Sequence, residues 1–140
     1  FLCNWCSYAA SDVAGVSRMQ YPPNNRFIRV MCSARVNEKF IWHAFKLGAP
    51  LVLVSGCHIG DCHYITANHY TQRRVDRMWD AMEKLGIRPE RLQLEWISAA
   101  EGPRFVEIMH ELEKLRQGVT HEEIEHTRKV LAESDKIKTA

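Results

Sequence analysis

The sequence predicts a single α/β domain with about four mostly parallel strands, helices on both faces of the sheet, and an extra C-terminal helix. Three observations support this fold class. Segments with strand character alternate four times with segments of helical period. The run Leu51–Ser55 is apolar without alternation, as expected for a strand that is covered on both faces. The length of 140 residues suits one domain with a substantial core.

The first strand–helix unit begins the chain. Phe1–Cys3 is interpreted as the end of a strand, so we expect a short segment to precede it. A loop over Asn4–Tyr8 leads to a predicted helix, Ser11–Met19, which Ser11 or Asp12 could cap. The prolines and asparagines of Tyr21–Asn25 cannot continue that helix.

The second unit starts with the predicted strand Phe27–Met31, and Cys32 stands at its end. Asn37 is placed to cap a helix that runs to about Leu47. Gly48 then has the position that glycine commonly takes just after a helix.

The third unit pairs the strand Leu51–Ser55 with a long helix predicted from about Asp61 to Leu85 and ended by Gly86. Its core stripe consists of Val75, Met78, Trp79, Met82 and Leu85. A turn at Pro89 then leads to Leu92–Ile97, which mostly alternates with period two. We therefore predict a fourth strand, nearer an edge of the sheet.

Two more helices are predicted after the fourth strand. The first begins near Pro103, a residue suited to the first turn of a helix. Its core stripe consists of Phe105, Ile108, Met109, Leu112 and Leu115, and Gly118 ends it. Thr120–Glu123 matches a capping box and starts a final helix to about Glu133, with Ile124, Thr127 and Leu131 as its stripe. Ser134–Ala140 is a predicted frayed tail. We thus divide the chain into an α/β domain, 1–118, which contains all the cysteines, and a C-terminal helix and tail, 119–140.

Cysteines provide the main functional signal. Cys6, Cys32 and Cys57 each follow the carboxyl end of a predicted strand, and Cys62 is expected at the N-terminus of the next helix. Right-handed crossovers place all strand-to-helix turns at one edge of a parallel sheet, where ligands bind. These sulfurs should therefore converge.

Four thiolates suit an iron–sulfur cluster or zinc. The pairs Cys3-x2-Cys6 and Cys57-x4-Cys62 are compatible with zinc, and C-x4-C is also an element of plant-type [2Fe–2S] proteins. A redox-active Cys3-x2-Cys6 pair and buried structural thiols are the alternatives. His58 and His63 flank the cysteines and are interpreted as neighbours of the site rather than ligands.

Composition and motifs exclude several other classes. The net charge of +2 is too small to indicate nucleic acid or a membrane surface as a partner. No apolar run approaches the roughly 20 residues needed to cross a bilayer, and no signal-peptide core opens the chain. We therefore expect a cytoplasmic protein. No P-loop, dinucleotide fingerprint or catalytic triad stands out.

Several separated blocks together resemble one family, the delta subunit of methyl-viologen-reducing hydrogenase. These blocks are Cys3–Tyr8, Tyr21–Pro23, Arg29–Ser33 and Gly56–Tyr64. The resemblance extends from Phe1 to about Ile97. It implies a small [2Fe–2S] protein of methanogenic archaea and related anaerobes, with a flavodoxin-like fold. Ala10 and Ala34 stand where glycine is expected in the family.

The resemblance also implies a function in electron transport and no catalysis by the chain itself. Such proteins relay electrons from a [NiFe]-hydrogenase, or from a formate dehydrogenase, to the FAD subunit of heterodisulfide reductase. That complex performs flavin-based electron bifurcation. A [2Fe–2S] cluster needs four cysteines, and we predict Cys6, Cys32, Cys57 and Cys62. Cys3 falls inside the predicted strand and is kept as the alternative ligand. A structural zinc-binding scaffold is the alternative function.

Overall fold

The computed structural model describes the backbone of residues 1–139 and the side chains of residues 1–134. Four strands form one parallel sheet in the order β2-β1-β3-β4. They are β1 (Leu2–Cys3), β2 (Arg29–Val30), β3 (Val52–Gly56) and β4 (Leu92–Trp96). This order matches the first four positions of flavodoxin-like sheets and confirms the predicted fold class. As expected, β4 lies at an edge.

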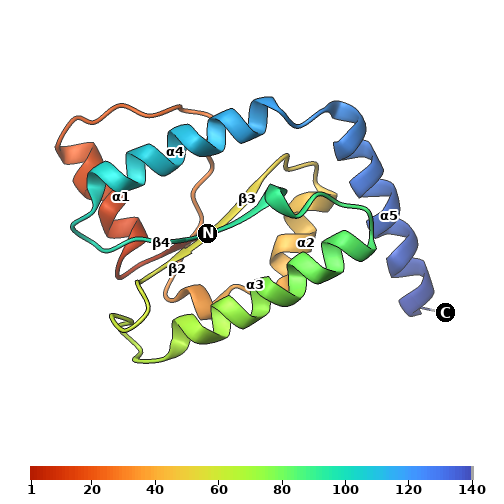
Figure 1. The fold of residues 1–140 in the computed structure, drawn as a ribbon, viewed down its shortest axis with the longest axis horizontal. Helices are drawn as coiled ribbons and strands as arrows, with labels where there is room; N and C mark the ends of the chain where they lie inside the picture. Colours follow the sequence, from red (N-terminus) through yellow and green to blue (C-terminus); the bar gives the residue numbers. More distant parts are fainter. Residues whose placement is uncertain (140) are drawn as a thin grey trace.

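Helices cover both faces of this sheet (Figure 1). One face carries α1 and α4, and the other carries α2 and α3, with α5 packed beside α2. The helices are α1 (Ser7–Val16), α2 (Glu38–Lys46), α3 (Ala67–Lys84), α4 (Gly102–Gln117) and α5 (His121–Thr139).

The predicted apolar stripes form the two cores. On one face, Ala10 and Ala14 of α1 pack with the α4 stripe around Phe105. On the other face, the α3 stripe packs with Phe45 of α2 and Leu131 of α5. Leu115 is the exception, since its side chain is 38% exposed and belongs to neither group of buried residues.

Predicted helix caps are confirmed at several points. The Asn37 side chain accepts a hydrogen bond from the Lys39 N–H, which caps α2. Gly48 and Gly86 adopt positive φ angles just after α2 and α3. Thr120 and Glu123 make both bonds of the capping box, at 2.9 and 3.2 Å.

The C-terminal helix is longer than expected. It continues to Thr139, so the tail predicted from Ser134 is helical as far as the described backbone extends, and residue 140 lies outside it. Thr127 and Leu131 are buried, and the helix docks on α2 of its own chain.

The predicted starts of two helices were wrong. α1 begins at Ser7 rather than Ser11, because Ser7 is buried and bonded to the strands and the chain turns directly after Cys6. α3 begins at Ala67 rather than Asp61. Between β3 and α3 the chain forms a loop that includes a bridge between Cys62 and Ile65, and Ile65 has a φ of +67°. That left-handed angle is incompatible with an α-helix.

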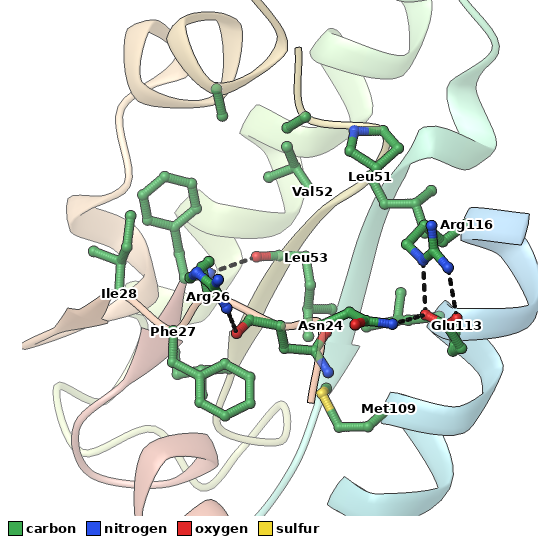
Figure 2. Close-up of a pocket in the computed structure, with 17 residues that line it drawn as sticks. Asn24, Arg26, Phe27, Ile28, Leu51, Val52, Leu53, Met109, Glu113 and Arg116 are labelled. Carbon is green, nitrogen blue, oxygen red and sulfur yellow. Dashed lines mark hydrogen bonds and ion pairs between the residues drawn. The ribbon is translucent and has the colours of Figure 1, made fainter. Parts of the chain in front are cut away.

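A cavity of about 350 Å³ lies away from the cysteines (Figure 2). It is bordered by residues at the start of β3, by the Asn24–Ile28 loop and by α4. Glu113 of α4 holds the loop by accepting a hydrogen bond from Asn24, and Arg116 of the same helix donates to the Glu113 carboxylate. No helix within the described backbone is long and apolar enough to cross a membrane.

Candidate metal centre

Neighbouring strands β1 and β3 lead to opposite faces of the sheet, and we call the point where their carboxyl ends lie side by side the crevice. The chain leaves β1 into α1 on one face of the sheet, and it leaves β3 toward α3 on the other face. The two loops therefore diverge at this point, which is where parallel α/β sheets bind their ligands. The first loop carries Cys6 directly after Cys3 of β1, and the second carries Cys57 and Cys62.

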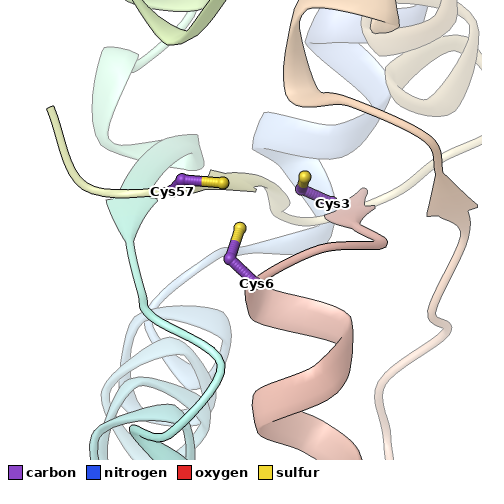
Figure 3. A group of neighbouring side chains, drawn as sticks. All are labelled: Cys3, Cys6 and Cys57. Carbon is purple, nitrogen blue, oxygen red and sulfur yellow. The ribbon is translucent and has the colours of Figure 1, made fainter. Parts of the chain in front are cut away.

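Three thiols meet in this crevice. The Sγ atoms of Cys3, Cys6 and Cys57 all lie within 4.8 Å of one another (Figure 3). The pairing register of β1 and β3 explains why these thiols are close. Leu2 of β1 pairs with Ser55 of β3, so the next residue, Cys3, lies beside the end of β3. All three side chains are buried.

The other two cysteines lie close to this group. Cys62 is partly buried and packs against the three buried cysteines. Cys32 follows β2, the neighbour of β1, and the carbonyl of Met31 lies 3.8 Å from the Cys3 sulfur. Burial first, and then the charges of Cys3, Cys62 and Cys57, raise the pKa of the Cys32 thiol.

The predicted ligands are therefore drawn to one edge, together with Cys3. Cys6 and Cys57 belong both to the predicted set and to the closest group. Cys3 lies inside β1, as expected, yet its side chain points toward the other two (Figure 3). Cys3 was predicted only as the alternative ligand because it falls inside a strand. The last residue of a strand, however, lies as close to the crevice as the residues of the loop that follows.

Hydrogen bonding and burial separate the thiol pKa values. The Cys6 thiol lies where it can donate to the Cys3 sulfur, which lowers the pKa of Cys3 to about 6 and raises that of Cys6. Burial raises the pKa of Cys57 and of Cys32. Metal binding requires thiolates, so loading this site would release protons.

Polar side chains of α3 hold the cysteine loops in place. Asn68 is fully buried, and its amide donates to the carbonyls of Cys57 and His58 at 3.0 and 2.8 Å. Thr71 is buried and bonds the Ser33 hydroxyl beside Cys32 at 2.8 Å. The sequence contained a signal for both residues: they continue the apolar stripe of Val75 toward the N-terminus, so two polar side chains occupy core positions.

Arg74 and Ser7 add two further braces. Arg74 donates to the carbonyls of Ala34 and Val36 at 3.0 and 2.8 Å, which fastens the turn after Cys32 to α3. The Ser7 hydroxyl accepts from the Cys3 N–H at 2.9 Å and donates to the Ser55 carbonyl at 3.2 Å. The loops are thus fixed by contacts that leave the sulfurs free to bind a metal.

Both flanking histidines contact groups other than the thiols. His58 pairs with Glu101 at 2.6 Å, and Glu101 also accepts from the Ser98 N–H at 2.6 Å. The backbone N–H of Ser98 and then His58 lower the pKa of the Glu101 carboxyl. His63 stacks on Trp5 with ring centres 3.8 Å apart. These contacts agree with the interpretation of both residues as neighbours of the site.

The predicted position of Cys62 was wrong. The sequence predicts Cys62 at a helix N-terminus, where the helix dipole favours a thiolate. It lies instead in the loop before α3, five positions ahead of Ala67, where the dipole has little effect.

The donor set fits a thiophilic metal. A tetrahedral ion with metal–sulfur bonds of about 2.3 Å separates its sulfurs by about 3.8 Å, a spacing that sulfurs within 4.8 Å of one another can adopt with small shifts. Soft thiolates select zinc and iron–sulfur clusters. Fold and site together define a parallel α/β domain that gathers cysteines, a donor set suited to a thiophilic metal, at the carboxyl ends of its strands.

The chain belongs to the family of the methyl-viologen-reducing hydrogenase delta subunit, whose model matches residues 1–117. This confirms the resemblance seen in the sequence. Over 112 residues the chain is 54% identical to the vhc iron–sulfur subunit of the F420-non-reducing hydrogenase from Methanococcus voltae, a match that covers 80% of this chain and 78% of the relative. It is 49% identical to the iron–sulfur subunit of the corresponding hydrogenase from Archaeoglobus profundus, over 79% of this chain and 81% of the relative.

A second kind of relative is much longer. Over 114 residues the chain is 51% identical to part of the ferredoxin/F420H2-dependent CoB-CoM heterodisulfide reductase of Methanosarcina acetivorans. The match covers 81% of this chain but only 14% of that reductase polypeptide. A region homologous to this chain is therefore built into a larger reductase subunit.

Proposed function

We propose that this chain is an electron-transfer subunit that holds a [2Fe–2S] cluster at the β1/β3 crevice. The observation that carries the proposal is the meeting of thiols from two diverging loops at the ligand-binding edge of the sheet. Relatives that are named as iron–sulfur subunits support iron over zinc. Separate loops that each contribute cysteines are normal for such clusters.

We propose Cys6, Cys32, Cys57 and Cys62 as ligands, with Cys3 as the alternative. Cys6 and Cys57 are the central pair, since they belong to the closest group of thiols. Cys62 approaches from the loop before α3, and Cys32 approaches from the end of β2.

The bound cluster would accept and release one electron. The protein's own groups would exclude water from it and hold the surrounding backbone in place. Burial of Cys3, Cys6, Cys32 and Cys57 keeps water away from most of the sulfurs. Asn68 and Arg74 fix the backbone on both sides of the crevice, which limits rearrangement when the charge of the site changes.

We further propose that the electrons pass between a [NiFe]-hydrogenase or formate dehydrogenase and the FAD subunit of heterodisulfide reductase, in the cytoplasm. Two relationships support these partners. Some relatives are named as hydrogenase subunits, and another is a heterodisulfide reductase polypeptide that contains a homologous region. A domain that exists both as a separate chain and as part of a reductase suits a relay between two enzymes.

Anaerobic purification tests the cofactor. We expect about two irons and two acid-labile sulfides per chain, and an EPR signal after one-electron reduction. Stoichiometric zinc without sulfide would contradict the proposal and indicate the structural zinc scaffold instead.

Five single Cys→Ser variants test the ligand set. We expect visible absorbance to survive in Cys3→Ser and to be lost in the other four. If the absorbance were lost in Cys3→Ser but survived in Cys32→Ser or Cys62→Ser, Cys3 would be a ligand in place of the residue whose substitution is tolerated.

A further inference from the structure

Exposed apolar side chains lie on all the segments that carry the cysteines. Ile59 and Ile65 of the loop before α3 are exposed, as are Trp5 of the first cysteine loop and Met31 at the end of β2. Trp5 and Tyr64 are joined by a 3.1 Å hydrogen bond across the two cysteine loops. We call Trp5, Met31, Ile59, Tyr64 and Ile65 the crevice rim. Aromatic and aliphatic side chains of this kind form the centres of protein interfaces.

Ile65 gives the strongest indication that this surface has a function. It has a φ of +67°, which is a genuine outlier for a β-branched residue, and its side chain is 80% exposed. The Ile65 N–H donates to the Cys62 carbonyl at 2.8 Å, so the loop itself holds this backbone, but it leaves the apolar side chain in solvent. Strained residues cluster at ligand clamps and binding sites. A partner that covers Ile65 would explain why a large apolar side chain is kept exposed at this position.

Charge around the crevice rim indicates the chemistry of that partner. Exposed Arg29, Arg35 and Arg73 lie on β2, on the turn after Cys32 and on the first half of α3. Asp61 is the exposed acid of the second cysteine loop, and Glu101 is already paired with His58. The excess of cations favours a partner with an acidic border around an apolar centre.

We infer that the crevice rim is the docking surface for the electron-accepting partner, a redox protein with an apolar contact centre bordered by carboxylates. This inference rests on the proposed function. Docking here would bring the partner's redox group close to Trp5 and His63, which stack on each other and adjoin Cys6 and Cys62 in the chain. Electron transfer requires such close approach, whereas the cavity near β3's start lies at the other end of the strands.

The test uses the complete chain with its cluster and, as a probe, a purified FAD subunit of heterodisulfide reductase that carries no region homologous to this chain. The main variant is Ile65→Asn, because asparagine tolerates positive φ and should leave the fold intact. The matched control is Val16→Asn. Val16 is also β-branched and 83% exposed, but it ends α1 at the opposite edge of the sheet.

We expect Ile65→Asn to weaken binding about tenfold or more, as for a residue at the centre of an interface, and Val16→Asn to bind like the wild type. Arg35→Glu should weaken binding at low salt more than at high salt, and Arg26→Glu at the other end should not. Equal binding by Ile65→Asn and Val16→Asn would overturn the inferred surface.

Three readouts separate this inference from the proposed function. A wild-type chain without iron and sulfide would overturn the cluster and the inference with it. A cluster-loaded wild type that does not bind the FAD subunit would overturn the choice of partner. Binding that is insensitive to Ile65→Asn, with iron content unchanged, would overturn the crevice rim alone.

Discussion

Gly56 lies where the end of β3 approaches two other elements closely. A Cβ atom at this position would lie 2.6 Å from the Ser33 hydroxyl and 2.8 Å from the Trp96 ring. Both neighbours are held, since Ser33 is bonded to Thr71 and Trp96 pairs in register with Gly56. Only glycine fits without displacing the turn that follows Cys32.

Gly56→Ala should therefore destabilise the protein by about 1–3 kcal/mol, the usual cost of overpacking. It should also reduce iron content, because Ser33 adjoins Cys32. Urea unfolding and iron analysis would measure the two effects.

Gly15→Ala provides a control with the opposite expected effect on the free energy of unfolding. Nothing lies within 4 Å of a Cβ at Gly15, and this residue is inside α1. We expect a gain of about 0.5–1 kcal/mol from helix propensity. A Gly56→Ala protein as stable as the Gly15→Ala protein would show that the close approach does not matter.

At the scale of elements, the aromatic contact between the cysteine loops should protect the site. Trp5 stacks on His63 and donates to Tyr64, so one side chain of the first loop holds two of the second. Trp5→Leu should speed the loss of the cluster in air several-fold, because water and oxygen gain access. The decay of visible absorbance measures this rate. Phe40→Leu, an exposed aromatic change on α2, should leave it unchanged.

Arg91 holds α5 against the rest of the fold. Its buried guanidinium donates to the carbonyls of Ala49, Pro50 and Glu123 and to the Thr127 hydroxyl, at 2.6–3.2 Å. It also lies over the Phe45 ring.

Arg91→Met should lower the free energy of unfolding by about 3 kcal/mol, because buried carbonyls lose their donor. Arg128→Met is the control, since Arg128 is an exposed α5 arginine whose ion pair, among the side chains of residues 1–134, is with Glu125; it should cost less than about 0.5 kcal/mol. Equal thermal midpoints for the two variants would refute the role of Arg91.

Elements also show how far sequence reasoning reaches. The alternation of strand and helix, the caps at Asn37 and Thr120, and the apolar stripes were all predictable, because each depends on local chemistry. The starts of α1 and α3 were not. No capping pattern marks Ser7, and no glycine or asparagine marks Ile65 as the residue with a positive φ, which the bridge to Cys62 accompanies. The convergence of Cys6 and Cys57 followed from topology, whereas the closeness of Cys3 depends on register, which spacing alone does not give.

For the whole molecule, the cysteines and α5 lie at opposite ends of the sheet. α5 contacts α2, and Arg91 ties it to residues that precede β3. The cysteines follow the carboxyl ends of the strands. The family match stops at residue 117, before α5 begins. The molecule thus has a cysteine-bearing end that the family match covers and, at the other end, a helix that lies beyond that match.

This separation predicts a local response to cofactor removal. Binding to the folded state stabilises mainly the groups that hold the ligand. We therefore expect chelation of the metal to speed backbone hydrogen exchange in the three cysteine loops, which are residues 3–6, 31–36 and 57–66. Residues 121–134 of α5 should exchange as before, because the core around Leu131 and the Arg91 contacts involve no cysteine.

Hydrogen exchange measured by mass spectrometry on the loaded and chelated chain tests this expectation. The Arg91→Met variant gives the mirror-image control, with faster exchange in α5 and unchanged exchange in the cysteine loops. Equal acceleration along the whole chain on chelation would mean that metal and fold form one cooperative unit. The cysteine loops would then be part of the core itself, and the electron transfer proposed for one end of the molecule would depend on the stability that Arg91 and α5 supply at the other.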